Sequence, residues 1–140
     1  MLLKLRALIL IWLFTSISHA SELDGKALYC RATEGIAKDY YLFAERLFLF
    51  ESGSKIREFY ISEENPLEIT KSPSVDYGET FDRIAFEGHI LDRKTAELWA
   101  PNNHSYECKV SPDNDGMKFL SPIIRRMLTK MKKRASENKL

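Results

Sequence analysis

The chain has 140 residues, and its 21 lysine and arginine residues nearly balance its 20 aspartate and glutamate residues, which leaves a formal net charge of +1. Once an N-terminal targeting segment is set aside, a chain of this length has room for one small domain and not for two. After that segment no apolar run approaches the ~20 residues that span a bilayer, so we expect the mature protein to be soluble.

The first 20 residues have the three-part layout of a secretory signal peptide. Lys4 and Arg6 precede an unbroken run of eight apolar residues that ends at Phe14, and small residues stand at the −3 and −1 positions of a cut after Ala20. Eight apolar residues are too few for a membrane span, so cleavage is favoured over an uncleaved anchor. We expect residues 1–20 to be removed and the protein to be exported, to the periplasm or the extracellular space.

Charge is distributed unevenly along the chain. Residues 21–120 carry 12 basic and 19 acidic residues, a net charge of −7, whereas residues 121–140 carry seven basic residues and one acidic residue, a net charge of +6. The mature protein is thus an acidic body with a basic tail. Such asymmetry indicates either an anionic partner for the tail or a tail that folds back on its own acidic domain.

Residues 21–112 are predicted to form a β domain of short antiparallel strands. Period-2 alternation places Tyr106 and Cys108 on the inward face of the last strand. In the first strand, Leu28 and Cys30 share an apolar face. The expected fold class is mainly β, a small antiparallel barrel or sandwich with one C-terminal helix.

Cys30 and Cys108 are the two cysteines of the chain. Export to an oxidising compartment favours a disulfide between them over a free thiol or a metal ligand. In the chain-entropy account, closing a loop of about 80 residues removes roughly 4–5 kcal/mol of freedom from the unfolded state. We therefore predict a disulfide that staples the first strand to the last, as closing a barrel or clamping a sandwich would require.

Two stretches of the β domain carry more specific expectations. The sequence KSPSVDYGET at 71–80 has the Pro, Gly and Ser spacing of a loop and is the best candidate for a mobile segment. The segment 81–91 is predicted as one strand with a bend at an internal glycine. Ile84 and Ile90 would then share the buried face, and His89 would lie on the opposite face with charged neighbours.

Residues 113–140 are predicted to hold a basic amphipathic helix and a polar tail. Ser121 is a good N-cap and Pro122 suits the first helical position, where its missing N–H costs nothing, so we expect the helix to begin there. The apolar side chains that follow at helical spacing and form one stripe are Ile123, Ile124, Met127, Leu128 and Met131. The basic side chains on the other faces are Arg125, Arg126, Lys130, Lys132, Lys133 and Arg134.

This basic helix has two interpretations, which are compatible. In the first, the six basic residues lie on an anionic membrane surface or another polyanion, each contributing about 1 kcal/mol near such a surface. In the second, the apolar stripe packs on the sheet and the charged side chains are solvated. Nucleic acid is not an expected partner, because the body is acidic and no aromatic residue is interleaved with the basic residues after Phe119.

The sequence contains no set of residues that indicates a catalytic site or a cofactor site. His89, His104 and Cys108 are the candidates for metal binding, but a disulfide would remove Cys108, the best ligand among them. The chain has no Gly-x-Ser-x-Gly turn, no phosphate-binding glycine loop and no His-Glu-x-x-His helix. We expect no metal, no cofactor and no enzymatic activity.

Aromatic side chains offer another candidate binding surface. One small core is not expected to bury all of them, and an uncovered patch or a barrel mouth would be a binding site. The aromatic residues in question are Tyr29, Tyr40, Tyr41, Phe59, Tyr77 and Trp99.

The layout of the chain resembles that of the small periplasmic β-barrels that inhibit C-type lysozymes. The resemblance rests on a signal peptide and on the sequences LYC and YEC at the two ends of a run of short strands, and it covers architecture only. That family carries a Ser-Gly-x-(Arg/Lys)-Tyr loop, whose nearest counterpart here, SVDYGET, lacks the pattern. No site residue follows from the resemblance.

Together these features predict a small exported binding or interaction module of the cell envelope, without enzymatic activity, whose β domain recognises a protein or a small ligand. The first alternative is association with the envelope or a membrane surface through the basic helix. The second alternative is a hydrolase of unrecognised type, which would need convergent polar groups with perturbed pKa values in one cleft.

Overall fold

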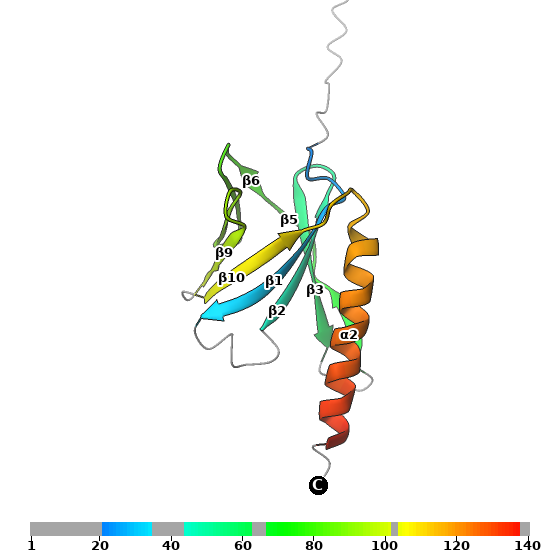
Figure 1. Cartoon of the computed structure of the whole chain (residues 1–140). Helices are drawn as coiled ribbons and strands as arrows, with labels where there is room; N and C mark the ends of the chain where they lie inside the picture. Colours follow the sequence, from blue (N-terminus) through cyan, green and yellow to red (C-terminus); the bar gives the residue numbers. More distant parts are fainter. Residues whose placement is uncertain (1–20, 35–43, 63–66, 102–103, 138–140) are drawn as a thin grey trace, which may run out of the picture.

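The computed structural model describes residues 21–34, 44–62, 67–101 and 104–137. One antiparallel sheet curls into a half-barrel, and one long helix lies along its outside (Figure 1). The expected fold class is confirmed. The strands are β1 (Ala27–Glu34), β2 (Glu45–Glu51), β3 (Lys55–Ser62), β4 (Glu68–Lys71), β5 (Val75–Asp76), β6 (Gly78–Glu79), β7 (Arg83–Phe86), β8 (His89–Asp92), β9 (Glu97–Ala100) and β10 (His104–Val110), and the helix is α2 (Gly116–Glu137). The predicted signal peptide lies outside the described residues.

The first and last strands are neighbours in the middle of the sheet. The strand order is β4-β3-β2-β1-β10-β9-β8-β7-β6, with β5 paired to β3. Cys30 lies opposite Cys108 in the β1–β10 register, and a disulfide with an Sγ–Sγ distance of 2.04 Å joins them. The predicted disulfide is confirmed, although it crosses the centre of the sheet and does not close a seam at its edges. A disulfide indicates an oxidising, non-cytoplasmic environment.

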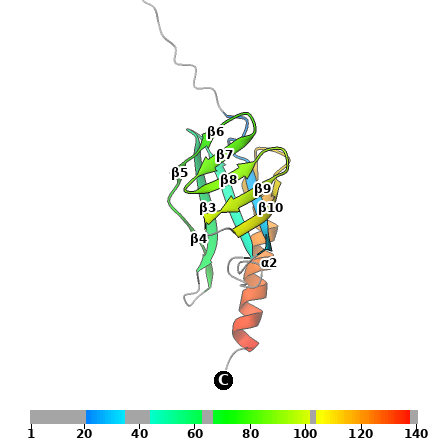
Figure 2. The ribbon, with the colours of Figure 1, turned by 90° about the vertical axis from the view of Figure 1, so that its left-hand side faces the viewer.

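The segment 71–80, predicted to be a mobile loop, contains two short strands. Residues 75 and 76 pair with β3, and residues 78 and 79 pair with β7, so this segment connects two distant parts of the sheet (Figure 2). Between them, Tyr77 is buried and packs edge-on against Phe50, with ring centroids 5.3 Å apart. The prediction of a loop is wrong here, because a buried aromatic anchors a stretch whose Pro, Gly and Ser content is typical of loops.

The inner face of the half-barrel is filled by apolar side chains. Alternate residues of each strand point inward, as period 2 requires. Leu28 and Phe48 are almost fully buried and lie opposite each other on β1 and β2. Tyr106 and Cys108 of β10 are buried, as expected. The core residues of this face are Leu23, Leu28, Cys30, Phe48, Phe50, Ile56, Tyr77, Ile84, Phe86, Leu91, Leu98, Ala100, Tyr106 and Cys108.

The outer face of β1, β2 and β3 is covered by α2. Leu120 and Ile124 of the helix are buried against Ala27, Leu47 and Phe59, which are the residues that alternate with the inner core. Ile123, Met127 and Leu128 are half-buried beside them. The apolar stripe of the helix is therefore used for docking on the sheet. Among the described residues, no helix combines the length and apolar character needed to cross a membrane.

The helix begins six residues before the predicted start, at Gly116 and not at Pro122. Asp115 is the N-cap, since its Oδ1 accepts a hydrogen bond from the backbone N–H of Lys118 at 3.2 Å. Ser121 and Pro122 lie inside the helix, so the predicted start is wrong. The early start requires Gly116, because a Cβ at this position would lie 2.5 Å from the backbone oxygen of Gly25.

The segment 81–91 is a hairpin and not one bent strand. Glu87 and Gly88 both have positive φ, 40° and 75°, and form the tight turn between β7 and β8. This turn reverses which residues face inward. As a consequence His89 is buried and Ile90 is 42% exposed, the opposite of the prediction, whereas Ile84 is buried as expected.

Candidate binding groove

The six basic residues predicted to contact an anionic surface lie on different sides of α2. Arg126, Lys130 and Arg134 are spaced four residues apart and line a groove next to β1. The other three, Arg125, Lys132 and Lys133, are exposed and do not line this groove. We call the first set the groove row and the second set the outer set.

The groove lies between α2 and the start of β2 on one side and the outer face of β1 on the other. Its volume is about 660 Å³, within the range typical of ligand sites. Its lining is basic and partly apolar, with Glu45 as its acidic side chain among the described residues. The lining residues are Tyr29, Arg31, Ala32, Ala44, Glu45, Arg126, Met127, Lys130, Met131 and Arg134.

A three-residue cluster of Tyr29, Glu45 and Arg126 stands at one end of the groove. Arg126 donates from Nη2 to Glu45 Oε1 at 2.5 Å and to Tyr29 Oη at 3.0 Å. The Tyr29 hydroxyl also donates to Glu45 Oε1. The Glu45 carboxylate of β2 accepts from both Arg126 and Tyr29, and these contacts attach the helix to the sheet.

The pKa values in this cluster are shifted in opposite directions. Burial and the neighbouring Glu45 carboxylate raise the pKa of Tyr29, so the phenol stays protonated and donates. Burial acts to raise the pKa of Glu45, but the hydrogen bonds from Arg126 and Tyr29 outweigh it and lower that pKa. The groove thus contains one carboxylate that its own basic row already binds.

A second depression continues from the groove across the outer face of β1. It has a volume of about 460 Å³ and shares Tyr29, Arg31 and Ala32 with the groove. Glu97 and Glu107 line its far side. Lys109 of β10 lines it as well, so the surface changes from basic beside α2 to mixed charge beside β9 and β10, and an anionic ligand is favoured at the α2 end.

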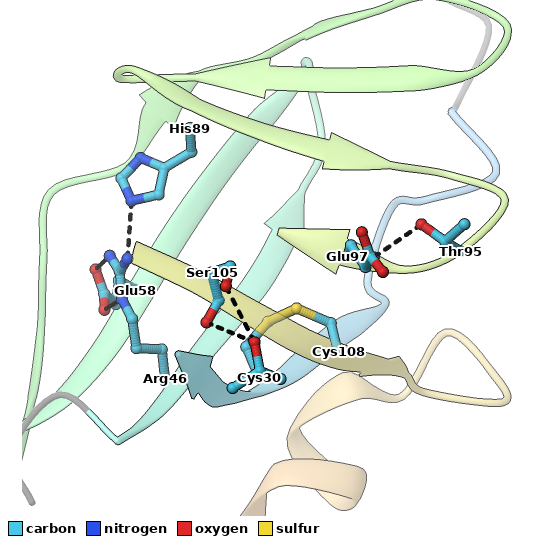
Figure 3. The surroundings of a disulfide bond; sticks show 9 residues. Cys30, Arg46, Glu58, His89, Thr95, Glu97, Ser105 and Cys108 are labelled. Atoms are coloured by element: carbon cyan, nitrogen blue, oxygen red, sulfur yellow. Dashed lines mark hydrogen bonds and ion pairs between the residues drawn. A yellow bond between two sulfur atoms is a disulfide. The ribbon is translucent and has the colours of Figure 1, made fainter. Parts of the chain in front are cut away.

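A second charged cluster lies on the inner face, close to the disulfide (Figure 3). Arg46 makes a bidentate ion pair with Glu58, with both N···O distances 2.8 Å. Its Nη1 donates to His89 Nε2 at 2.8 Å, and its guanidinium carbon lies 4.9 Å from the centroid of the Phe48 ring. This cluster connects β2 and β3 to the β7–β8 hairpin across the interior of the half-barrel.

The inner cluster holds His89 in its neutral form. Nδ1 lies 3.1 Å from the carbonyl oxygen of Phe86 and 3.0 Å from that of Glu87, so Nδ1 carries the proton and Nε2 accepts from Arg46. Burial and the adjacent Arg46 lower the pKa of His89. Both ring nitrogens are engaged, and the Glu58 carboxylate is held by Arg46. This arrangement supports a structural role, and it gives the hydrolase hypothesis no free acid or base.

Other predicted candidates do not come together in a site. Within the described residues no cluster of three His, Cys, Asp or Glu side chains could hold a metal ion. Phe59 and Tyr77 are buried, Tyr29 lines the groove, and Trp99 is 51% exposed beside Ile90 on the outer face of β8 and β9. Tyr40 and Tyr41 lie outside the described residues.

The basic row was predicted from the sequence, and Tyr29 was named as a candidate exposed aromatic, but Arg31 and Glu45 were missed. Tyr29, Arg31 and Glu45 come from β1 and β2, 80 or more residues before the helix residues they face. Alternation could have found them, because Tyr29 and Arg31 point to the face opposite Leu28 and Cys30. Comparison with protein-family models, with curated proteins and with solved structures finds no match to this chain.

Proposed function

We propose that the protein is an exported, non-enzymatic binding module of the cell envelope that recognises an anionic ligand in the groove between α2 and β1. One observation carries this proposal: basic side chains from two elements, Arg31 of β1 and the groove row of α2, line one concave surface. Concave sites with a few placed charged groups are the usual form of ligand sites.

The half-barrel serves as a rigid support for this groove. Its interior is filled with side chains and crossed by the disulfide and the Arg46 cluster, so a ligand binds on the outside of the sheet. A site held between a docked helix and a braced sheet loses little conformational entropy on binding. Export is supported by the disulfide together with the signal-like N-terminus. The resemblance to lysozyme inhibitors transfers no residue, and the proposal does not depend on it.

Association with an anionic membrane surface is the second candidate function. It is favoured by the exposed outer set, since Lys132 and Lys133 lie on the last turns of α2, which extend beyond the sheet (Figure 1), and Arg125 lies nearer the middle of the helix. Most of the apolar stripe is already buried or half-buried beside the sheet, so this association would rest mainly on charge. It would therefore be weak at physiological salt.

Two matched variants separate these functions. The groove variant carries Arg31→Gln, Lys130→Gln and Arg134→Gln, and the outer variant carries Arg125→Gln, Lys132→Gln and Lys133→Gln. Each removes three positive charges and leaves Arg126 in its contact with Glu45. The probe is fluorescein-labelled poly-glutamate, titrated with the oxidised mature protein at low and high salt.

We expect the groove variant to lose at least about tenfold in affinity for poly-glutamate and the outer variant to lose about twofold or less. Equal losses in both variants would mean that net charge alone attracts the polymer, and the groove would not be the site. Co-sedimentation with anionic vesicles tests the second candidate, which requires the outer variant to bind less than the groove variant.

A further inference from the structure

The spacing of the groove row indicates the chemical class of ligand, which deepens the proposed function and rests on it. Arg126, Lys130 and Arg134 are four residues apart on one helix. With a rise of about 1.5 Å per residue, neighbouring Cα atoms of the row are about 6 Å apart along the helix axis. In an extended peptide, alternate side chains lie on one side and are separated by about 6.6 Å. The two repeats differ by about 0.6 Å per step, so neighbouring positions of the row match alternate side chains of an extended peptide.

One member of the row already binds a carboxylate of the protein itself. Glu45 places its carboxylate against Arg126 and the Tyr29 hydroxyl at one end of the groove. The row continues beyond this contact to Lys130, whose side chain is exposed, and then to Arg134. A carboxylate is thus a group that this end of the groove can bind through two hydrogen-bond donors.

The apolar lining suits the other face of such a peptide. Met127 and Met131 each follow a basic residue of the row, line the same groove and are half-buried. Methionine is flexible and adapts to partners of different shape. Together with Ala32 and Ala44 these side chains offer apolar contact next to each cation.

From these observations we infer that the groove binds an extended acidic peptide segment whose carboxylates stand at alternate positions, with apolar residues between them. The carboxylates at alternate positions pair with Lys130 and Arg134, and Arg31 approaches from the opposite wall. The apolar residues between them contact Met127 and Met131.

The test compares two short peptides of identical composition. One alternates glutamate and valine (EVEVE), and the other has the same residues in blocks (EEEVV). Both carry a fluorescein label on the same linker, and binding to the oxidised mature protein is measured by fluorescence anisotropy. The groove and outer variants defined above are tested in parallel, and circular dichroism verifies that each variant is folded.

We expect the alternating peptide to bind about fivefold more tightly than the block peptide, and we expect the groove variant to abolish this difference while the outer variant preserves it. Equal affinity for the two peptides, with both weakened in the groove variant, would overturn this inference and leave the anionic groove of the proposed function standing. If neither peptide nor poly-glutamate distinguishes the groove variant from the outer variant, both proposals fail. Binding to anionic vesicles without binding to either peptide would assign the row to lipid headgroups and overturn the inference.

Discussion

Two neighbouring residues of β2, Glu45 and Arg46, begin two charged clusters on opposite faces of the same sheet. Glu45 faces outward and joins Tyr29 and Arg126, whereas Arg46 faces inward and joins Glu58 and His89. Both clusters contain one arginine–glutamate pair and one further polar ring. They differ in the exposure of the arginine: the side chain of Arg46 is 15% exposed and that of Arg126 is 50% exposed, whereas both glutamates are largely buried, Glu58 at 28% and Glu45 at 15% exposed.

This difference in exposure assigns different roles to the two clusters: the inner cluster stabilises the fold, and the outer cluster lies where a ligand can bind. A charge pair that is largely removed from water is expensive to break, because the remaining partner is left without compensation. A pair at the surface is screened by water and salt, so breaking it costs little. We therefore expect changes on the inner face to alter stability, and changes on the outer face to alter helix attachment and ligand binding.

Removal of the disulfide should have the largest effect. Cys30 lies opposite Arg46 on the inner face, and the bond closes a loop with a sequence separation of 78 residues. The double substitution Cys30→Ala and Cys108→Ala should lower the free energy of unfolding by about 4 kcal/mol. Urea denaturation followed by circular dichroism measures this loss, with the reduced wild-type protein as the comparison. A loss below about 1 kcal/mol would contradict the assigned role of the bond.

Arg46→Met tests the inner cluster directly. The substitution leaves Glu58 without its bidentate partner and His89 without its donor, so we expect a loss of about 3 kcal/mol in the free energy of unfolding. Arg57→Met is the matched control on β3, because Arg57 forms a more exposed pair with Glu51. The control should lose less than about 1 kcal/mol. Similar losses in the two variants would remove the distinction between the faces.

The buried histidine should make stability depend on pH. Burial and Arg46 lower the pKa of His89 in the folded protein, so below about pH 6.5 the unfolded chain takes up a proton that the folded protein does not. The free energy of unfolding should then fall as the pH decreases from about 6.5 toward the folded-state pKa. Urea denaturation at several pH values measures this slope, and His89→Gln should flatten it. An unchanged slope in the variant would mean that other groups cause it.

Arg126→Met should have the smallest effect on stability. Arg126 is half-exposed, and Glu45 keeps the Tyr29 hydroxyl as a donor, so loss of the pair should cost about 0.5 kcal/mol at low salt and less at high salt. The apolar contacts of Leu120 and Ile124 keep the helix docked. Hydrogen exchange of α2 amides should show little change. If α2 detached from the sheet in this variant, the outer cluster would be needed to hold the helix, which would contradict the prediction.

Much of the fold could be predicted from local patterns. Alternation identified the inward faces of β1 and β10 and hence the disulfide, and the 3.6-residue period identified the docked stripe of α2. Both periodicities follow from backbone geometry, so each can be read from one segment without knowledge of its tertiary contacts. Export and the resemblance to lysozyme inhibitors stay predictions.

The features that were missed depend on contacts between distant segments. Glu87 adopts a positive φ in a tight turn, which its residue type does not signal, and the inward face of β8 was reversed as a result. Ser121 and Pro122 looked like a helix start, but the contact of Gly116 with Gly25 allows α2 to begin earlier. The groove needs β1, β2 and α2 together, so the sequence showed its basic row and Tyr29 as separate candidates and did not bring them into one site.

The adjacency of β1 and β10 has a consequence for how the chain reaches its native state. Hairpins on either side, β1 to β3 and β7 to β10, form from segments close in the chain, but they meet through strands whose cysteines are 78 residues apart. We expect this distant encounter to be a slow step of folding, because its loop-closure entropy must be overcome before the central contacts form. Once the cysteines are oxidised, the disulfide keeps β1 and β10 joined in the unfolded molecule. We therefore expect the oxidised chain to refold faster than the reduced chain.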